Sequence, residues 1–182
     1  MEKTTYRTQL WEVAVDHYGF VTTADAAELS IPAVELRKLA KRGFLDHVGR
    51  GLYRFGALPP TEFDHYMEAV LWVGRGAVLS HDAVLALHDL AFANPSTIRV
   101  TTPHRVRKTR PRRDVTIIEA DVSEDERTVF RGIPSTTVAR ALLDSRPLIM
   151  RSRLVEAAHE ARREGLLLAD EYQHVCQELR GR

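Results

Sequence analysis

The sequence predicts an α+β fold in two parts, a helical N-terminal part closed by a β-hairpin and a larger part that mixes helices with strands. Residues that start and stop helices alternate closely through residues 1–57. A proline pair, Pro59-Pro60, then interrupts regular structure and stiffens a short linker. Beyond it, stretches with helical spacing flank stretches rich in β-branched residues. We therefore expect one domain over residues 1–57 and a second over residues 61–182.

The first two helices are expected in quick succession. Apolar residues recur at the spacing of one helical face from about Thr5 to His17, and Gly19 ends this helix because glycine adopts the left-handed conformation that closes helices. Thr22 is the expected N-cap of the next helix, with an acidic residue three positions on, as in a capping box. That helix is short, and it ends near Leu29 at a turn that contains a proline.

The third helix, over about Pro32–Arg42, has two chemically different faces. One face gathers small and apolar residues that are expected to point inward: Ala33, Leu36, Leu39 and Ala40. The opposite face gathers one apolar side chain and several cations: Val34, Arg37, Lys38 and Lys41, with Arg42 near its edge. Exposed cations can reach phosphates or guanine, and an apolar side chain at the helix tip can contact a thymine methyl group. This face is therefore the expected DNA-recognition surface.

Two short β-like runs, Leu45–Val48 and Leu52–Phe55, follow the third helix and are joined by Gly49-Arg50-Gly51. They predict a hairpin with Arg50 at its tip and Arg54 on its outer face, where both can reach a DNA backbone. A capped helix, a turn, a basic helix and a hairpin in this order are the parts of a winged helix-turn-helix. A small helical subdomain with a solvated basic face is the alternative, and it explains the third helix but not the whole ordered set.

The second part is expected to be a small α+β domain with antiparallel strands and with helices before and after them. Ser80 and Ser135 are the expected N-caps of two of its helices. The expected helices have apolar residues at helical spacing: residues 62–73, 81–90, 136–144, 148–164 and 170–179. The expected strands are rich in β-branched residues: residues 98–102, 114–119 and 128–131.

The formal net charge is only +1, but the charges are segregated along the chain. Seven cations and no acid occur between Arg99 and Arg113, and five acids follow between Glu119 and Glu126. Most of the cations belong to one expected loop, Pro103–Arg113: Arg105, Arg107, Lys108, Arg110, Arg112 and Arg113. Crowded cations repel one another unless an anion is near, so we expect this loop to contact DNA phosphates or, second, an acidic surface of a partner protein. A solvated hairpin tip is the alternative.

Several classes of protein are disfavoured by the sequence. No apolar run approaches the ~20 residues that a membrane-spanning helix needs, and the first residues lack the pattern of a secretion signal. A single cysteine, Cys176, excludes an internal disulfide and fits a reducing compartment. We therefore expect a cytoplasmic protein without membrane contact.

No catalytic or metal-binding set is expected either. Ser80-His81-Asp82 has the residue types of a catalytic triad, but triads are assembled from distant segments. His81 and His88 can share a helix face, yet no third ligand completes a tetrahedral metal site. The acids around Asp114 and Glu119 lack the lysine that a metal-dependent nuclease pattern requires. We expect neither enzymatic activity nor a cofactor.

Four stretches together resemble the AbiEi-type antitoxins of bacterial toxin–antitoxin systems. They are the hairpin segment Arg50–Arg54 and the stretches Val78–Leu90, Ile98–Pro103 and Gly132–Asp144. The resemblance implies that the winged domain binds inverted repeats in the promoter of its own operon and represses that operon. It also implies that the second domain counteracts a partner toxin of the nucleotidyltransferase type.

The resemblance places the DNA-contacting helix at Pro32–Arg42 and the wing at Leu45–Phe55. Operators of such regulators have two-fold symmetry, so two copies of the chain are expected on one inverted repeat. Two alternatives stay open. One is a winged-helix regulator that senses a small ligand and has no toxin partner, which requires an apolar pocket with a few polar groups. The other is a nuclease that uses the winged domain for targeting.

Overall fold

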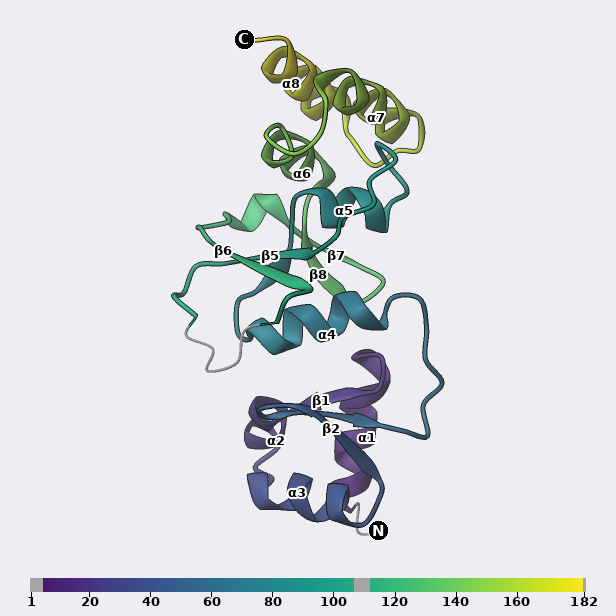
Figure 1. Ribbon diagram of the computed structural model, residues 1–182, viewed down its shortest axis with the longest axis vertical. Coiled ribbons are helices and arrows are strands. Elements are labelled where there is room, and N and C mark those ends of the chain that lie inside the picture. The colour runs from purple at the N-terminus through teal and green to yellow at the C-terminus, as the bar shows by residue number, and fades with distance from the viewer. Residues whose placement is uncertain (1–4, 107–111, 182) are drawn as a thin grey trace. The chain divides into compact units, whose positions relative to one another are not determined.

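The computed structural model describes residues 5–106 and 112–181. The chain divides into two compact units, Met1–Gly74 and Arg75–Arg182, which we call the first and the second unit and describe separately (Figure 1). Each unit contains both helices and a sheet, so the predicted α+β class is confirmed. Within the described residues, no helix is long and apolar enough to cross a membrane.

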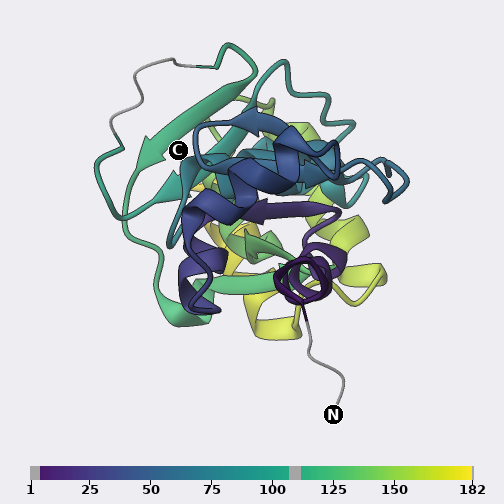
Figure 2. The same ribbon diagram turned by 90° about the horizontal axis from the view of Figure 1, so that it is seen from below.

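The described part of the first unit contains four helices and a three-stranded sheet. Its helices are α1 (Tyr6–Asp16), α2 (Thr23–Glu28), α3 (Ala33–Lys41) and α4 (Asp64–Val73). Its strands are β1 (Phe20–Thr22), β2 (Leu45–Gly49) and β3 (Leu52–Phe55), which are antiparallel in the order β1-β3-β2. Helix α1 is seen nearly end-on in Figure 2. Up to β3, this is the element order of a winged helix-turn-helix.

Local sequence signals set the helix starts in this unit. At α1, the backbone N–H of Thr8 donates to Thr5 Oγ1 at 3.3 Å. At α2, Thr22 and Asp25 form a reciprocal capping box, in which the Asp25 N–H donates to Thr22 Oγ1 (3.1 Å) and the Thr22 N–H donates to Asp25 Oδ2 (2.7 Å). The predicted starts of both helices are therefore confirmed. Strand β1 is absent from the sequence-based expectation, because three residues become a strand only through their pairing with β3.

Side chains from three helices and the sheet form one buried cluster in the first unit. Leu10 of α1, Ala26 of α2, Leu36 of α3 and Phe55 of β3 are all buried in it. Trp11 is partly buried and meets Phe55 edge to face, with the ring centroids 5.1 Å apart. Such a pair adds about 0.5–1.5 kcal/mol to the burial itself. This packing fixes the rotation of α3 and so decides which of its faces meets solvent.

The boundary expected after residue 57 differs from the division observed after Gly74. Helix α4 belongs to the first unit because Asp64 at its start forms an ion pair with Arg54 of β3 (Nη2–Oδ2, 2.9 Å). The rings of Tyr18 and Phe63 also meet edge to face, 6.4 Å apart. The proline-containing linker therefore lies inside the first unit. Whether residues 1–57 fold alone stays a prediction.

The second unit, coloured teal to yellow in Figure 1, contains a five-stranded sheet, with α5 and η1 between its strands in sequence and three helices after the last strand. Its described helices are α5 (Asp82–Leu87), α6 (Val138–Asp144), α7 (Arg151–Arg163), α8 (Ala169–Arg180) and the 3-10 turn η1 (Glu124–Glu126). Its strands are β4 (Val78–Leu79), β5 (Ile98–Thr102), β6 (Val115–Glu119), β7 (Arg127–Phe130) and β8 (Ile133–Thr136), in the order β6-β5-β4-β8-β7.

This sheet is mixed, which corrects the expectation of antiparallel strands throughout. The pairs β4–β5 and β7–β8 are antiparallel, whereas β4–β8 and β5–β6 are parallel. In the β5–β6 pair, Ile98 lies opposite Val115 and Thr102 lies opposite Glu119. Because β5 and β6 are parallel, they do not form the hairpin that the sequence predicts around the basic loop.

The two serines expected as helix caps are buried instead. Ser80 directly follows β4, Ser135 lies within β8, and neither residue has exposed surface. Helix α6 is capped by Thr137, whose Oγ1 accepts a hydrogen bond from the backbone N–H of Arg140 at 3.3 Å, and α5 begins without a side-chain cap. Strands β4 and β8 are both short, so their local sequence does not distinguish them from the approach to a helix.

Candidate nucleic-acid interface

Helix α3 presents the basic face that its sequence predicts. On its inner side, Leu36 is 0% and Leu39 is 7% exposed. All of the residues predicted to face outward are exposed: Val34, Arg37, Lys38, Lys41 and Arg42. Ala33, expected to point inward, is also exposed, and Ala40 is only half-buried. The buried stripe is therefore narrower than predicted, which leaves a broader surface for a ligand.

Most of the positive charge on this face is not neutralised by the protein itself. Lys38 Nζ lies 2.8 Å from Glu35 Oε1, one helical turn away, and both side chains are partly exposed to water. Such a surface pair contributes at most about 1 kcal/mol and can be exchanged for a phosphate contact. Arg37 and Lys41 form no ion pair within the part of the chain that the structure describes. The face is therefore suited to a polyanion.

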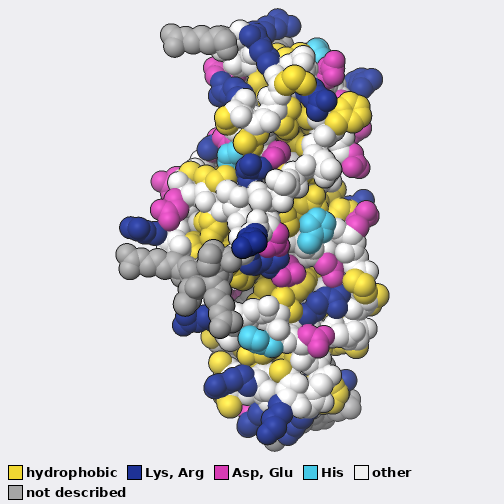
Figure 3. Space-filling view, in the orientation of Figure 1, with side chains coloured by type: hydrophobic (Ala, Val, Ile, Leu, Met, Phe, Trp, Pro, Cys, Tyr) yellow, Lys and Arg dark blue, Asp and Glu magenta, His cyan; other side chains and the backbone are white. Residues whose placement is uncertain are grey.

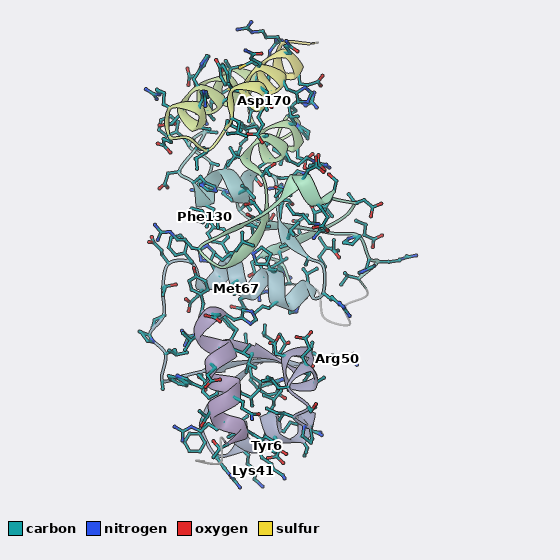
Figure 4. The ribbon with its side chains drawn as sticks, turned by 180° about the vertical axis from the view of Figure 1, so that it is seen from behind. Tyr6, Lys41, Arg50, Met67, Phe130 and Asp170 are labelled. Atoms are coloured by element: carbon teal, nitrogen blue, oxygen red, sulfur yellow. The ribbon has the colours of Figure 1, made fainter. Side chains whose placement is uncertain are left out.

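A further cation, Arg7, comes from α1. Its guanidinium carbon lies 4.4 Å from the centroid of the Phe44 ring, which follows α3 and is 41% exposed. An exposed contact of this kind is worth about 0.5–1 kcal/mol and restricts where the guanidinium lies. Figure 4 shows Tyr6, the neighbour of Arg7, at the same end of the first unit as Lys41.

Lys and Arg side chains gather at this end of the first unit, where α3 lies (Figure 3). Arg7 cannot be identified from the sequence, because no local pattern in α1 signals its contact with Phe44. A basic residue near the start of the first helix is the one weak signal, and it is too common to identify a site.

The hairpin tip is exposed but lies apart from the C-terminal end of α3. Arg50 is exposed at the turn between β2 and β3. Beside it, Gly51 has φ +71°, and a Cβ at that position would come within 2.8 Å of Thr23 Oγ1. The Thr23 N–H donates to the Gly51 carbonyl at 2.9 Å, which holds the tip against the start of α2. Figure 4 shows Arg50 away from Lys41, so the two cations would contact different parts of a duplex.

Arg54 is mostly buried and paired within the protein, which differs from the free outward position on β3 that the sequence predicts. Its guanidinium pairs with the Asp64 carboxylate at 2.9 Å, and the two side chains are only 16% and 15% exposed. The guanidinium carbon also lies 5.7 Å from the centroid of the Phe20 ring. Loss of one partner from such a mostly buried pair leaves an unpaired charge. These contacts favour a stabilising role of Arg54 in the first unit over a DNA contact.

In the second unit, the cations of the predicted basic loop have different environments. Three of them lie outside the described residues: Arg107, Lys108 and Arg110. Arg105 and Arg113 are exposed. Arg112 Nε donates to Asp114 Oδ1 at 3.0 Å, and this hydrogen bond lowers the pKa of the carboxyl. Arg99, before the loop, is also paired with an aspartate, at 2.6 Å. Nearby acids thus neutralise part of the charge that the sequence places here.

The Ser80–His81 pair is a structural contact. Ser80 is fully buried, and its Oγ accepts a hydrogen bond from Thr101 Oγ1 at 2.7 Å and lies 3.0 Å from His81 Nδ1. Burial lowers the pKa of His81, so its ring is mainly neutral at pH 7. A serine that no substrate reaches is not a nucleophile. Among the described residues, no three His, Cys, Asp or Glu side chains could hold a metal ion. Absence of enzymatic activity stays a prediction.

Comparisons with known proteins support the regulatory interpretation. Residues 9–56 match a family model described as "Transcriptional regulator, AbiEi antitoxin", which confirms the resemblance over this stretch. No curated protein matches the sequence. Among solved structures, the crystal structure of the RV2827C protein from Mycobacterium tuberculosis has a TM-score of 0.50 at 17% identity, over 97% of this chain and 78% of that one. At this identity the likeness shows the fold alone.

Proposed function

We propose, on the premise that residues 9–56 are those of an AbiEi-type transcriptional regulator, that this chain is an antitoxin which represses its own operon by binding the promoter. The observation that supports DNA binding most directly is the exposed side of α3. There, Arg37 and Lys41 face solvent without an ion-pair partner among the described residues, while Leu36 fixes the opposite side in the core. A helix held in this way can enter a major groove with its cations outward.

The proposed binding mode assigns different roles along the helix. Val34 lies in the first turn, where recognition helices contact base edges, and an apolar side chain there can pack against a thymine methyl group. Arg37, Lys38 and Lys41 lie further along and are proposed to contact guanine or phosphates. Arg7 is proposed to contact the backbone beside the end of α3, where Phe44 restricts it.

Further backbone contacts are proposed for exposed cations outside α3: Arg42, Arg50, Arg105 and Arg113. Two copies of the chain are proposed to bind one inverted repeat, because the half-sites of a symmetric operator are read by identical domains about one helical turn of DNA apart.

We also propose that the second unit counteracts a toxin of the nucleotidyltransferase type. The second-unit stretches that resemble the family form β4, α5, β5, β8 and α6, and Leu79, Leu85 and Leu142 within them have no exposed surface. These motifs therefore build the fold and leave the partner contacts to the surface. The cytoplasm is the proposed location, because the single cysteine requires no oxidising compartment.

A promoter reporter tests the proposal. The DNA upstream of the chain's own reading frame is fused to a reporter gene, and the full chain is expressed from a separate promoter. We expect the parent chain to repress the reporter. Scrambling one arm of the inverted repeat should abolish this repression. In the same cells, the full chain should restore growth when the adjacent nucleotidyltransferase-type toxin is induced. Neither repression nor rescue by a well-expressed chain contradicts the proposal.

A further inference from the structure

Glu35 is the one acidic residue of α3, and it lies in the first turn of that helix. Recognition helices contact base edges with this turn, and Val34, the neighbour of Glu35, is 41% exposed. A carboxylate beside a DNA backbone is repelled by the phosphates, so an acid at this place lowers the affinity for DNA of any sequence. The proposed function gives Glu35 no role, although it lies among the cations that are proposed to contact DNA.

Helix capping does not explain this glutamate. An acid at the third position of a helix often accepts a hydrogen bond from the backbone N–H of the N-cap residue. Asp25 does so at α2 and Glu171 does so at α8, each at 2.7 Å. The N-cap of α3 is Pro32, whose backbone nitrogen carries no hydrogen. Glu35 therefore lacks the backbone donor that the acids at the starts of these two other helices use.

Lys38 is the partner of Glu35 within the described residues. Its Nζ donates to Glu35 Oε1 at 2.8 Å, and the side chains of Lys38 and Glu35 are 54% and 24% exposed. No second hydrogen bond to this carboxylate is found in the part of the chain that the structure describes. An ammonium has three N–H donors, and one of them is used here. This flank of α3 thus offers an open acceptor, Glu35 Oε2, next to open donors on Lys38.

The base pairs present different groups to such a flank in the major groove. Cytosine presents one donor, its N4 amino group, and its paired guanine presents two acceptors, O6 and N7. A carboxylate next to an ammonium is complementary to that pattern, because the carboxylate accepts from cytosine while the ammonium donates to guanine. The N6 amino group of adenine lies instead between two acceptors, adenine N7 and thymine O4, and both repel a carboxylate. A C·G pair is therefore the best match.

We propose that Glu35 determines the specificity of α3 for a C·G base pair in each half-site of the operator. Glu35 Oε2 accepts a hydrogen bond from cytosine N4, and Lys38 donates to the guanine of the same pair. Repulsion by the phosphates weakens binding to every sequence, whereas the contact with cytosine strengthens binding to the operator alone, so the acid increases discrimination. This inference rests on the proposed function, operator binding through α3, and adds the base pair that α3 reads.

Base-pair substitution in the operator tests the inference. Each base pair of one half-site is replaced in turn by the other three, with the symmetric change in the other half-site, and binding of the full chain is measured by fluorescence anisotropy. The parent should prefer one C·G pair at least about tenfold, the size expected for a mismatched base pair. In Glu35→Gln this preference should be lost or should move to an A·T pair, because an amide pairs with adenine N6 and N7.

Glu12→Gln is the control variant, because it removes the same charge from an exposed residue of α1 in the first unit. It should keep the base preference of the parent. Both variants should bind DNA of unrelated sequence at least as tightly as the parent, since less negative charge meets the phosphates. In a second measurement, 2-pyrimidinone, which lacks the amino group, replaces the cytosine of the preferred pair. This change should weaken binding of the parent about tenfold and affect Glu35→Gln much less.

An unchanged base preference in Glu35→Gln overturns the inference, and so does full parental affinity with 2-pyrimidinone at every cytosine of the half-site. Loss of the preference in Glu12→Gln also overturns it, because net charge and not a base contact would then set the preference. In these cases the proposed function stands, provided that the parent binds its operator more tightly than unrelated DNA. If the parent binds the two equally, the proposed function fails together with the inference.

Discussion

Arg7 of α1 lies over the ring of Phe44, with 4.4 Å between its guanidinium carbon and the ring centroid. The contact joins the first turn of α1 to the residue that follows the helix-closing Gly43. It therefore places a cation from one helix beside the end of another, a juxtaposition that no local pattern specifies. Phe44 remains 41% exposed, so the pair is open to a ligand on its solvent side.

Replacement of Arg7 by alanine is expected to weaken promoter binding a few-fold and to flatten its salt dependence. One phosphate contact contributes about 0.9 to the slope of log affinity against log salt concentration. Fluorescence anisotropy titrations at several salt concentrations measure that slope. Arg163→Ala is the matched control, because Arg163 is exposed on α7 in the second unit. A slope equal to that of the parent removes Arg7 from the interface. Phe44→Leu should give an intermediate loss, because it keeps an apolar side chain but no ring.

The Arg54–Asp64 ion pair is expected to affect stability and not DNA recognition. Arg54→Ala or Asp64→Asn should lower the free energy of unfolding of the first unit by about 1–3 kcal/mol, between the values for exposed and buried pairs. Urea denaturation followed by tryptophan fluorescence measures this, and the double variant should cost less than the sum of the two single changes. An Arg54 variant that unfolds like the parent but loses DNA affinity reinstates Arg54 as a wing contact.

Alanine substitutions at Gly43 and Gly51 should distinguish the loss of stability caused by a positive φ from the loss caused by steric crowding. Gly51 and Gly43 have φ +71° and +78°, but only Gly51 has an atom within reach, Thr23 Oγ1 at 2.8 Å from the added Cβ. Gly43→Ala should destabilise the first unit by about 1 kcal/mol through backbone strain. Gly51→Ala should cost more, about 2–3 kcal/mol, because the hairpin tip must also move from α2. Equal unfolding free energies for the two variants contradict the close approach of the tip to α2.

Protonation of His81 is expected to destabilise the second unit at acidic pH. Burial lowers the pKa of this ring below its ordinary value of 6.5, so the folded state prefers the neutral form and the unfolded state binds the proton more readily. Stability associated with the neutral ring is therefore full above pH 6.5 and falls as the pH drops below that value. Urea midpoints of the parent and of His81→Asn between pH 5 and 8 measure the effect. The parent should lose more stability than the variant over this range; parallel pH profiles contradict the prediction.

The sequence predicts best what local chemistry decides. The capping box of Thr22 and Asp25 and the outward cations of α3 are both specified by spacing within a few residues, and both are found as expected. The environment of Arg54 depends on a residue distant in sequence. Strand alternation predicts that its side chain points outward, but the carboxylate of Asp64 in α4 pairs with it and covers it.

In the second unit, too, local sequence does not predict features that depend on distant residues. Ser80 has the sequence context of a helix cap, but β4 is paired on both sides and carries it into the interior. The parallel pairing of β5 and β6 is likewise determined by tertiary structure, and the two strand sequences alone do not predict it. The turn at Ala91 and Phe92 has positive φ angles, although neither position is the glycine or asparagine that would signal such a turn in the sequence.

The most direct test of DNA recognition by α3 is the binding isotherm of the double variant Arg37→Ala/Lys41→Ala on the chain's own promoter fragment. Both side chains are exposed, so the variant should fold like the parent, which circular dichroism checks. The double variant should bind at least about tenfold more weakly, and the salt slope should fall by about 0.9 for each phosphate that the variant no longer binds. An isotherm that coincides with that of the parent, from a folded variant, contradicts the assignment of α3 as the recognition helix.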